Sequence, residues 1–408
     1  MHIHQFTVRN FLIHQTTTVD LSPLSVLVGA NGAGKSAFFD ALLNFSMLSR
    51  GNIQQAFGPY PFSYNATIYR GATAGVSRIG FAATMSQERD SSERYKYEIT
   101  YEQVQGQSPP RYSIINEKLT NETSGSVEFD RTDPDAYEIT SKIRLEQDRC
   151  LFSAIRLARA TQEFSPFLDY LTQQISRMNK FRLDPFSLAT PSRVPQIDSE
   201  PTSGLIPRIG YNGEDLAATL YYLANTEDPA FELIKQRIRD LVAEFEDFEF
   251  STVGTDKIAF AVKYSDRRET VPSVRLSSGM LIFIGLICLV STPNRPPVLM
   301  VEEPENGLTP QAIKVFYDAV RSLAFSDDIE TRSQVLISSH SPFVICDAWN
   351  GEDRDFIHQV RVNGGRSQVR KFSEVIGEHG IQLGKVDGDR THLSLKNAED
   401  VMSGRFAG

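Results

Sequence analysis

The sequence is poor in cysteine and has no long apolar run. Its 408 residues include only three cysteines, Cys150, Cys288 and Cys346. Their wide spacing suits neither a zinc site nor a disulfide framework, so we expect a reducing cytoplasm. The longest apolar stretch, residues 280–290, is too short to span a bilayer, and the first residues lack the apolar core of a secretory signal. The expected protein is therefore cytoplasmic and has no membrane partner.

Basic residues and heptads are also scarce. Lys and Arg number 42 against 51 Asp and Glu, which gives a net charge of −9. This balance argues against a whole surface that binds nucleic acid, although a local basic patch, and hence DNA as a partner, stays open. No helical stretch carries three or four heptads with apolar a and d positions, so a long coiled coil is not expected.

The most informative segment that is present follows a short apolar run at residues 25–28. Residues 29–36 read Gly-Ala-Asn-Gly-Ala-Gly-Lys-Ser and fit the phosphate-loop pattern G-x-x-x-x-G-K-[ST]. A helical pattern comes next, and a strand, a glycine loop and a helix are the context that makes such a motif credible. The alternative, a glycine-rich turn with a chance Gly-Lys-Ser, does not explain these flanks.

The chemistry of phosphate binding explains these residue types. Glycines let the backbone turn so that successive N–H groups point at phosphate oxygens, and the helix N-terminus adds partial positive charge. Lys35 can reach the β- and γ-phosphates, and the Ser36 hydroxyl can bind Mg²⁺. The predicted nucleotide-binding residues of this loop are Ala30, Asn31, Gly32, Ala33, Gly34, Lys35, Ser36 and Ala37.

A second motif ends an apolar strand pattern with two acids. Residues 298–304 read Val-Leu-Met-Val-Glu-Glu-Pro, and ligands of open α/β sheets bind at the carboxyl ends of the strands. One acid, Glu302, can hold Mg²⁺ or its waters, and the next, Glu303, can orient or deprotonate the attacking water. Taken alone, the pair is equally well explained as a solvated strand end; together with the phosphate loop it favours a site.

Two further motifs are open to structural explanations. Leu-Ser-Ser-Gly at residues 276–279 precedes the long apolar stretch, and Ser is a favoured N-cap, so plain helix capping is one interpretation. In the other, Ser277 and Gly279 bind a γ-phosphate presented by another subunit. His340 follows an apolar strand pattern, where it is either structural or a donor to the γ-phosphate or the attacking water.

The order of the remaining patterns predicts an α/β protein. Strand patterns in the first third suggest an antiparallel meander, two amphipathic helical stretches occupy the middle, and the last third alternates strand and helix as parallel strands require. The strand patterns lie at residues 3–11, 19–21, 25–28, 65–69, 76–84, 94–101, 111–115, 248–253, 257–262, 297–301 and 334–338, and the helical ones at 145–180, 215–244 and 311–324. We expect three parts: residues 1–140 with the phosphate loop and meander, an inserted helical lobe at 141–250, and 251–408 with the remaining motifs.

In this order (phosphate loop, Leu-Ser-x-Gly, acidic strand, histidine) the chain resembles ABC-type ATPase heads of the RecF/SMC branch. It is most similar to stand-alone ATPase families related to the overcoming-lysogenization-defect (OLD) proteins. The resemblance covers about residues 1–350. The segments that carry it are 8–11, 28–36, 181–185, 212–216, 276–279, 302–308 and 339–342.

The resemblance implies a mixed central sheet and ATP and Mg²⁺ as cofactors. It also implies a homodimer or higher homo-oligomer, in which two heads meet and close over two ATPs. It assigns phosphate contacts to Lys35, magnesium contacts to Ser36 and Glu302, and contacts in trans to Ser277 and Gly279; the catalytic residues that it implies are Glu303, His340 and Lys35. Some positions depart from the pattern: Glu302 stands where aspartate is commoner, Thr309 where histidine is usual, and Leu12 where a basic residue is usual. The glutamine of the family's Q-loop has only weak candidates, Gln87 and Gln162.

Two functions follow from the resemblance. The first is an ATPase whose dimerisation acts on DNA or on a bound partner, in DNA repair or phage defence. The second is a slow-turnover scaffold, gated by nucleotide, that sequesters or activates a separately encoded effector such as a nuclease or toxin. An intrinsic nuclease is not expected, because the segment after His340 shows no convincing metal constellation.

Overall fold

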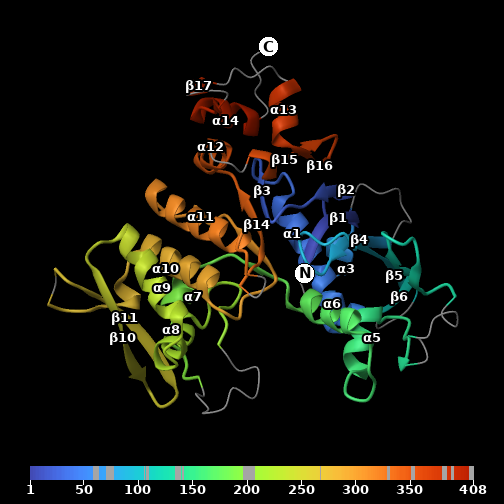
Figure 1. Ribbon diagram of the computed structural model, residues 1–408, viewed down its shortest axis with the longest axis horizontal. Helices are drawn as coiled ribbons and strands as arrows, with labels where there is room; N and C mark the ends of the chain where they lie inside the picture. The colour runs from blue at the N-terminus through green and yellow to red at the C-terminus, as the bar shows by residue number, and fades with distance from the viewer. Residues whose placement is uncertain are drawn as a thin grey trace. The chain divides into compact units, whose positions relative to one another are not determined.

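The computed structural model divides the chain into two compact units (Figure 1). The first unit comprises Met1–Asn179, Pro296–Val298 and Ala348–Gly408, and the second comprises Lys180–Arg295 and Leu299–Asp347. Both ends of the chain therefore belong to the first unit. The structure describes residues 1–57, 64–69, 78–104, 106, 110–133, 139, 142–195, 207–266, 268–328, 331–350, 354–378, 384–386 and 390–403.

An antiparallel sheet forms the larger part of the first unit. Its strand order is β2-β1-β4-β5-β6-β7, and each neighbouring pair is antiparallel, so the predicted meander is confirmed. The strand predicted at residues 65–69 is wrong: Tyr64–Thr67 forms the short helix α3, and only Ile68 bridges to Phe11. The strands are β1 (His2–Phe11), β2 (His14–Asp20), β4 (Arg78–Ser86), β5 (Tyr95–Val104), β6 (Arg111–Asn121) and β7 (Val127–Asp130).

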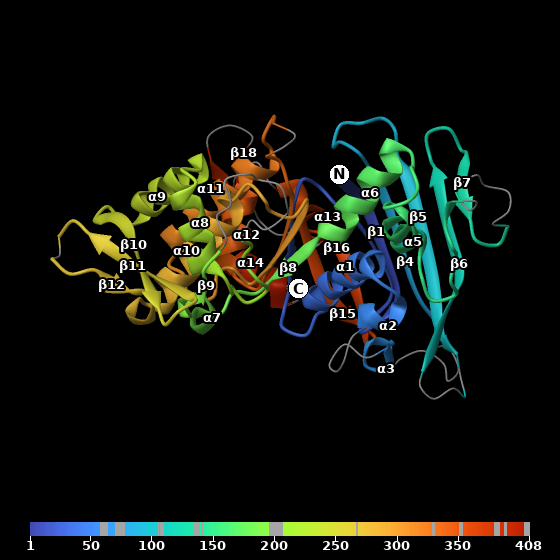
Figure 2. The ribbon, with the colours of Figure 1, turned by 90° about the horizontal axis from the view of Figure 1, so that it is seen from below.

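Three helices cover one face of this sheet: α1 (Lys35–Arg50), α5 (Leu151–Ala158) and α6 (Pro166–Arg177) (Figure 2). Phe38 and Phe45 of α1 meet Phe6 of β1 at ring-centroid distances of 5.7 and 5.6 Å. All three rings are almost fully buried. Such aromatic burial stabilises the packing of α1 on the sheet and so fixes the helix that follows the phosphate loop.

A second set of strands in the first unit carries the phosphate loop. Strand β3 (Leu24–Val28) is completely buried and lies parallel to β15 (Ile357–Asn363), which is antiparallel to β16 (Arg366–Lys371). A short, fully buried apolar strand is typical of parallel pairing. The remaining elements are α2 (Ile53–Phe57), η3 (Arg354–Phe356), α13 (Phe372–Glu378), β17 (Gly384–Val386), β18 (Arg390–His392) and α14 (Leu395–Ser403).

The second unit contains the acidic strand. Its neighbouring strands run in the order β14-β13-β8, with β13 at Val298–Glu302, β14 at Gln334–Ser339 and β8 at Asn179–Phe181. Helix α11 (Pro310–Ala324) connects β13 to β14, as the sequence predicts. Helix α12 (Pro342–Asn350) follows β14.

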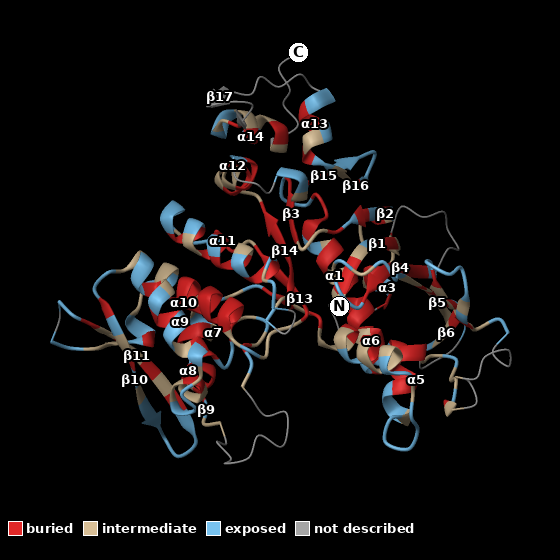
Figure 3. Cartoon of the chain, in the orientation of Figure 1, coloured by how far each residue is buried: buried red, intermediate tan, exposed pale blue. Residues whose placement is uncertain are grey.

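The apolar stretch after the serine turn forms α10 (Ser278–Ser291), which is buried from Leu281 to Ser291 (Figure 3). Helices α7, α9 and α11 contact it. The two predicted strands at 248–253 and 257–262 form the hairpin β10–β11. The surrounding elements are α7 (Pro185–Ala189), β9 (Ser192–Arg193), α8 (Leu216–Asn225), α9 (Pro229–Leu241), β10 (Phe245–Val253), β11 (Lys257–Tyr264), β12 (Val271–Pro272) and η2 (Ser273–Arg275).

The helices are short. Within the described ranges none exceeds the 16 residues of α1, so the expectation of no long coiled coil agrees with the described part of the chain. No described helix is both long and apolar enough to cross a bilayer. The fold is the mixed α/β arrangement that the sequence predicts.

Candidate functional site

The phosphate loop has the geometry that its glycines imply. The chain leaves β3 at Val28, turns with Gly32 at φ 77° and Gly34 at φ 110°, and enters α1 at Lys35. A side chain at Gly29 would place its Cβ only 2.1 Å from the carbonyl oxygen of Val360 in β15, so that position requires glycine. No side chain caps α1, which leaves its first N–H groups for an anion.

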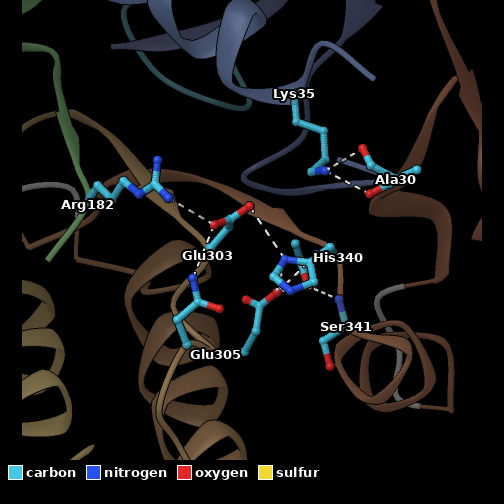
Figure 4. Close-up of polar contacts among 10 residues, drawn as sticks. Ala30, Lys35, Arg182, Glu303, Glu305, His340 and Ser341 are labelled. Atoms are coloured by element: carbon cyan, nitrogen blue, oxygen red, sulfur yellow. Dashed lines mark hydrogen bonds and ion pairs between the residues drawn. The ribbon is translucent and has the colours of Figure 1, made fainter. Parts of the chain in front are cut away.

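Lys35 lies folded back on this loop (Figure 4). Its Nζ donates hydrogen bonds to the carbonyl oxygens of Gly29 at 2.7 Å and Ala30 at 3.0 Å. The residue is 5% exposed, whereas Asn31 and Ser36 are exposed. The loop thus presents a cation and a hydroxyl beside a helix N-terminus that no side chain caps, which is a suitable lining for a phosphate chain.

Two residues that sequence reasoning missed support the loop from behind. His14 of β2 contacts the carbonyl oxygen of Gly34 through Nε2 at 3.0 Å, and Ser367 of β16 donates to that of Ala33 at 2.8 Å. Burial lowers the pKa of His14 to about 4. No local signal reveals either residue, because each lies outside the motif.

The acidic strand β13 ends in Glu302, which is 4% exposed. Its Oε2 lies 3.4 Å from Nζ of Lys180 in β8, and both side chains are buried. Its Oε1 has no hydrogen-bond partner among the described residues. A buried carboxylate oxygen without a donor is a suitable ligand for Mg²⁺ or its water, so this residue fits the predicted role.

Glu303 adopts a positive φ of 47°, which is uncommon for a residue with a side chain. Its Oε2 lies 3.4 Å from an Arg182 nitrogen and accepts from Asn306 at 3.1 Å, and its Oε1 lies 3.4 Å from Nδ1 of His340 (Figure 4). Strained backbone of this kind clusters at functional sites. The structure therefore brings together Glu303 and His340, two of the residues that the sequence analysis selects as site candidates.

Glu305, another residue that sequence reasoning missed as a site residue, positions the histidine. Its Oε1 accepts from the Ser339 hydroxyl at 2.7 Å and from the backbone N–H of His340 at 3.0 Å, and lies 3.6 Å from the ring Nδ1 (Figure 4). The sequence contains a signal that could have identified Glu305, since this acid directly follows the Glu-Glu-Pro motif.

A small pocket of about 40 Å³ lies beside these acids. It is lined by Arg182, Leu183, Ile282, Leu286, Val301, Glu302, Glu303, Pro304 and Asn306.

The serine turn has a clear structural role within one copy. Ser277 is the N-cap of α10, and its hydroxyl accepts from the Met280 N–H at 3.2 Å. A Cβ on Gly279 would meet the carbonyl oxygen of Gly307 at 2.5 Å, so this glycine allows close packing on the loop after β13. Ser277 is exposed, which leaves its predicted contact with a second subunit as a prediction.

The part of the chain that the structure describes contains no group of three or more His, Cys, Asp and Glu that could hold a metal ion.

Comparison with known proteins identifies the family. No curated protein matches the chain. Among solved structures, one similar fold is the crystal structure of the Smc head domain with an extended coiled coil bound to the C-terminal domain of ScpA, from Pyrococcus furiosus. It is 12% identical, has a TM-score of 0.49, and the match covers 93% of this chain and 100% of that one. A family model described as "AAA domain, putative AbiEii toxin, Type IV TA system" matches residues 24–347. Because the match spans well over half of the sequence and includes the phosphate loop, both acids and His340, the chain belongs to this family of P-loop ATPase domains.

Proposed function

We propose that the chain binds ATP with Mg²⁺ and hydrolyses it. The observation that carries this proposal is the uncapped N-terminus of α1 behind a glycine loop, with Lys35 poised on the loop carbonyls. When a triphosphate binds, the amine of Lys35 exchanges those carbonyls for phosphate oxygens, and the loop N–H groups bind the others. The Ser36 hydroxyl and Glu302 Oε1 are the residues that would hold Mg²⁺, which when bound neutralises charge on the phosphates.

Glu303 and His340 supply the chemistry in this proposal. Glu303 accepts a proton from water as the water oxygen attacks the γ-phosphorus, and the bond to the β,γ-bridging oxygen breaks to leave ADP and phosphate. His340 donates a hydrogen bond to the γ-phosphate or to the water, and Glu305 fixes its backbone. The 3.4 Å contact between Glu303 and His340 keeps the two groups within reach of one reacting centre.

Phosphate release tests this function. We expect Lys35→Ala to weaken nucleotide binding and Glu303→Gln to retain binding while hydrolysis falls by about 10²–10⁴-fold, the usual contribution of a general base. Glu163→Gln, an exposed change of the same kind, is the matched control. Equal hydrolysis by wild type and Glu303→Gln would remove Glu303 from the mechanism.

The wider role is part of the same proposal. Following the resemblance to RecF/SMC-type and OLD-related ATPases, two copies close over ATP, with Ser277 and Gly279 of each facing the nucleotide of the other. The exposure of Ser277 at the N-terminus of α10 supports this arrangement, because a helix N-terminus attracts a γ-phosphate. The cycle then acts on DNA or on a partner protein, in DNA repair or phage defence.

A slow-turnover scaffold is the second candidate, and the contacts of Glu303 favour it. The carboxylate is already engaged by Arg182, Asn306 and His340, so it must give up contacts before it can take a proton from water. Such a protein would hold or release an effector, such as a nuclease or toxin, according to bound nucleotide. A partner that copurifies with the wild-type protein from native cells, but not with Lys35→Ala, would support this function. Faster ATP hydrolysis by Arg182→Ala would show that the contact of Arg182 with Glu303 slows turnover.

A further inference from the structure

We propose that His14 and Ser367 are positioning residues that orient the phosphate-binding peptide groups of the loop. The inference rests on the proposed nucleotide binding and goes beyond it, because neither residue belongs to the motif. Both lie outside the residues that the family model matches: His14 precedes residue 24 and Ser367 follows residue 347. All of the contacts involved lie within the first unit.

The two side chains form hydrogen bonds with the carbonyl groups of two consecutive loop residues. The Ser367 hydroxyl donates to the Ala33 oxygen at 2.8 Å, and Nε2 of His14 lies 3.0 Å from the Gly34 oxygen. A carbonyl oxygen can only accept, so Nε2 carries the hydrogen of the ring. A Cβ on Gly34 would lie 2.6 Å from the Ser367 hydroxyl, which shows how closely β16 approaches the loop.

Peptide geometry transmits these contacts to the phosphate side. In a trans peptide the C=O and the following N–H point in opposite directions. The hydrogen bond from Ser367 directs the Ala33 carbonyl toward β16, so the N–H of Gly34 points away from β16. In the same way, the contact with His14 directs the Gly34 carbonyl toward β2, so the N–H of Lys35 points away from β2. These two N–H groups belong to the turn and first helical position that bind phosphate in such loops.

The histidine is itself held in the required form. It is completely buried, and its Nδ1 lies 2.9 Å from the Thr17 hydroxyl, which also lies 3.3 Å from the Ser367 carbonyl oxygen. Because the Gly34 carbonyl can only accept, it is this contact that places the ring hydrogen on Nε2, and Nδ1 then accepts. The Thr17 hydroxyl is compatible with this tautomer, because its single hydrogen can point to Nδ1 at 2.9 Å instead of to the more distant Ser367 carbonyl. Strands β2 and β16 thus act together as a brace behind the loop.

The experiment compares variants that keep or remove the donors. His14→Phe retains a ring but no N–H, whereas His14→Gln retains an N–H that can reach the Gly34 oxygen; Ser367→Ala removes a single hydroxyl. Ser124→Ala, in an exposed turn of the same unit, is the control. Dissociation constants of ADP and ATP are measured by calorimetry, with kcat and KM for hydrolysis.

We expect His14→Phe and Ser367→Ala to weaken both nucleotides by about 5–50-fold, the range for one oriented hydrogen bond. His14→Gln should stay within about 3-fold of wild type by the same reasoning, because its amide replaces the donor. KM should rise while kcat changes little, since neither residue touches reacting atoms. A residue that only stabilised the fold would not raise KM while leaving kcat unchanged, and its loss would not be reversed by the N–H of glutamine.

Folding is checked by the emission of Trp349, the single tryptophan, which is buried in the first unit. If His14→Phe fails to fold, Ser367→Ala carries the test alone. Wild-type affinity in folded Ser367→Ala, or equal weakening by His14→Gln and His14→Phe, overturns the inference. Failure of the proposed function would be a different result, because the wild-type protein itself would then not bind nucleotide.

Discussion

At the scale of single residues, the buried ion pair of Lys180 and Glu302 affects the stability of the second unit. Both side chains are at most 5% exposed, and their charged atoms are 3.4 Å apart. Removing one partner of a buried ion pair leaves an uncompensated charge and typically costs about 3–5 kcal/mol. We therefore expect Lys180→Met to lower the free energy of unfolding of the second unit by about that amount, measured by urea unfolding with circular dichroism.

A double variant isolates the cause of that loss. Replacing both partners, in Lys180→Met with Glu302→Gln, removes the uncompensated charge, so most of the stability should return. If the double variant instead lost the sum of the stability losses of the two single variants, the two charges would not interact.

The glycine of the serine turn provides a second residue-scale prediction. A Cβ on Gly279 would lie 2.5 Å from the backbone oxygen of Gly307, whereas a Cβ on Gly377 in α13 would meet nothing within 4 Å. Gly279→Ala should therefore destabilise the protein by about 1–3 kcal/mol through overpacking. Gly377→Ala should be neutral or stabilising by up to about 1 kcal/mol, because alanine is the better helix former. Equal melting temperatures for the two variants would contradict the close approach.

At the scale of elements, a buried acid joins the meander to the helix that follows it. Glu117 of β6 is completely buried and accepts two hydrogen bonds from Arg131, at 2.6 and 2.8 Å, while its other oxygen accepts from the Tyr97 hydroxyl and the first N–H of α5, that of Leu151. Arg131 also donates to carbonyl oxygens of the segment before α5. The sheet and α5 are thus coupled through one carboxylate.

Glu117→Gln should uncouple them. The guanidinium of Arg131 would lose its counter-charge inside the protein, and we expect a loss of about 3–5 kcal/mol. Glu98→Gln, whose charge partners Arg9 and Lys96 are on the surface of the same sheet, should cost no more than about 1 kcal/mol. Hydrogen exchange of the α5 amides checks the result: unchanged protection in Glu117→Gln would show that the acid does not hold the helix.

The same scale explains which elements the sequence predicts. The strand, loop and helix around Lys35 follow from local pattern, because each depends on neighbours within a few residues. The segment 65–69 has a strand-like composition but folds as α3, since its tertiary neighbours override propensity. Ser367 could not be predicted, because it meets Ala33 across 334 positions of the chain. Glu303 and His340 were predictable only through motif order, and their contacts with Arg182 and Glu305 were not.

At the scale of the whole molecule, buried histidines predict sensitivity to acid. Burial lowers the pKa of His14 and of His358 to about 4, and that of His2 to about 3. In the unfolded chain these groups titrate near 6.5. As the pH falls from about 6.5 toward 4, the unfolded chain takes up protons that the folded protein does not, so the free energy of unfolding falls. Above pH 6.5 this contribution is complete.

Urea unfolding followed by Trp349 fluorescence measures this effect in the first unit, where all three histidines lie. Between pH 7 and 5 we expect a loss on the order of a few kcal/mol. The variant His358→Gln should show a flatter dependence, because it cannot be protonated. A stability that stays constant over this range, or one that rises toward pH 5, would contradict the neutral burial of these rings.

The proposed dimer makes the sharpest whole-molecule prediction, because each of its two sites draws Lys35 from one copy and Ser277 from the other. Lys35→Ala and Ser277→Arg should each abolish hydrolysis alone, the first by losing the phosphate contact and the second by blocking the shared surface. When the two variants are mixed, mixed dimers contain one site in which both residues are native and one in which both are changed. Phosphate release should therefore reappear in the mixture and rise with the proportion of mixed dimers. In an equimolar mixture that assembles at random it should reach about a quarter of the wild-type rate, because about half of the dimers are mixed and each of those has one native site. If both residues served a site within one copy, mixing could restore nothing, because every copy would still carry its own defect.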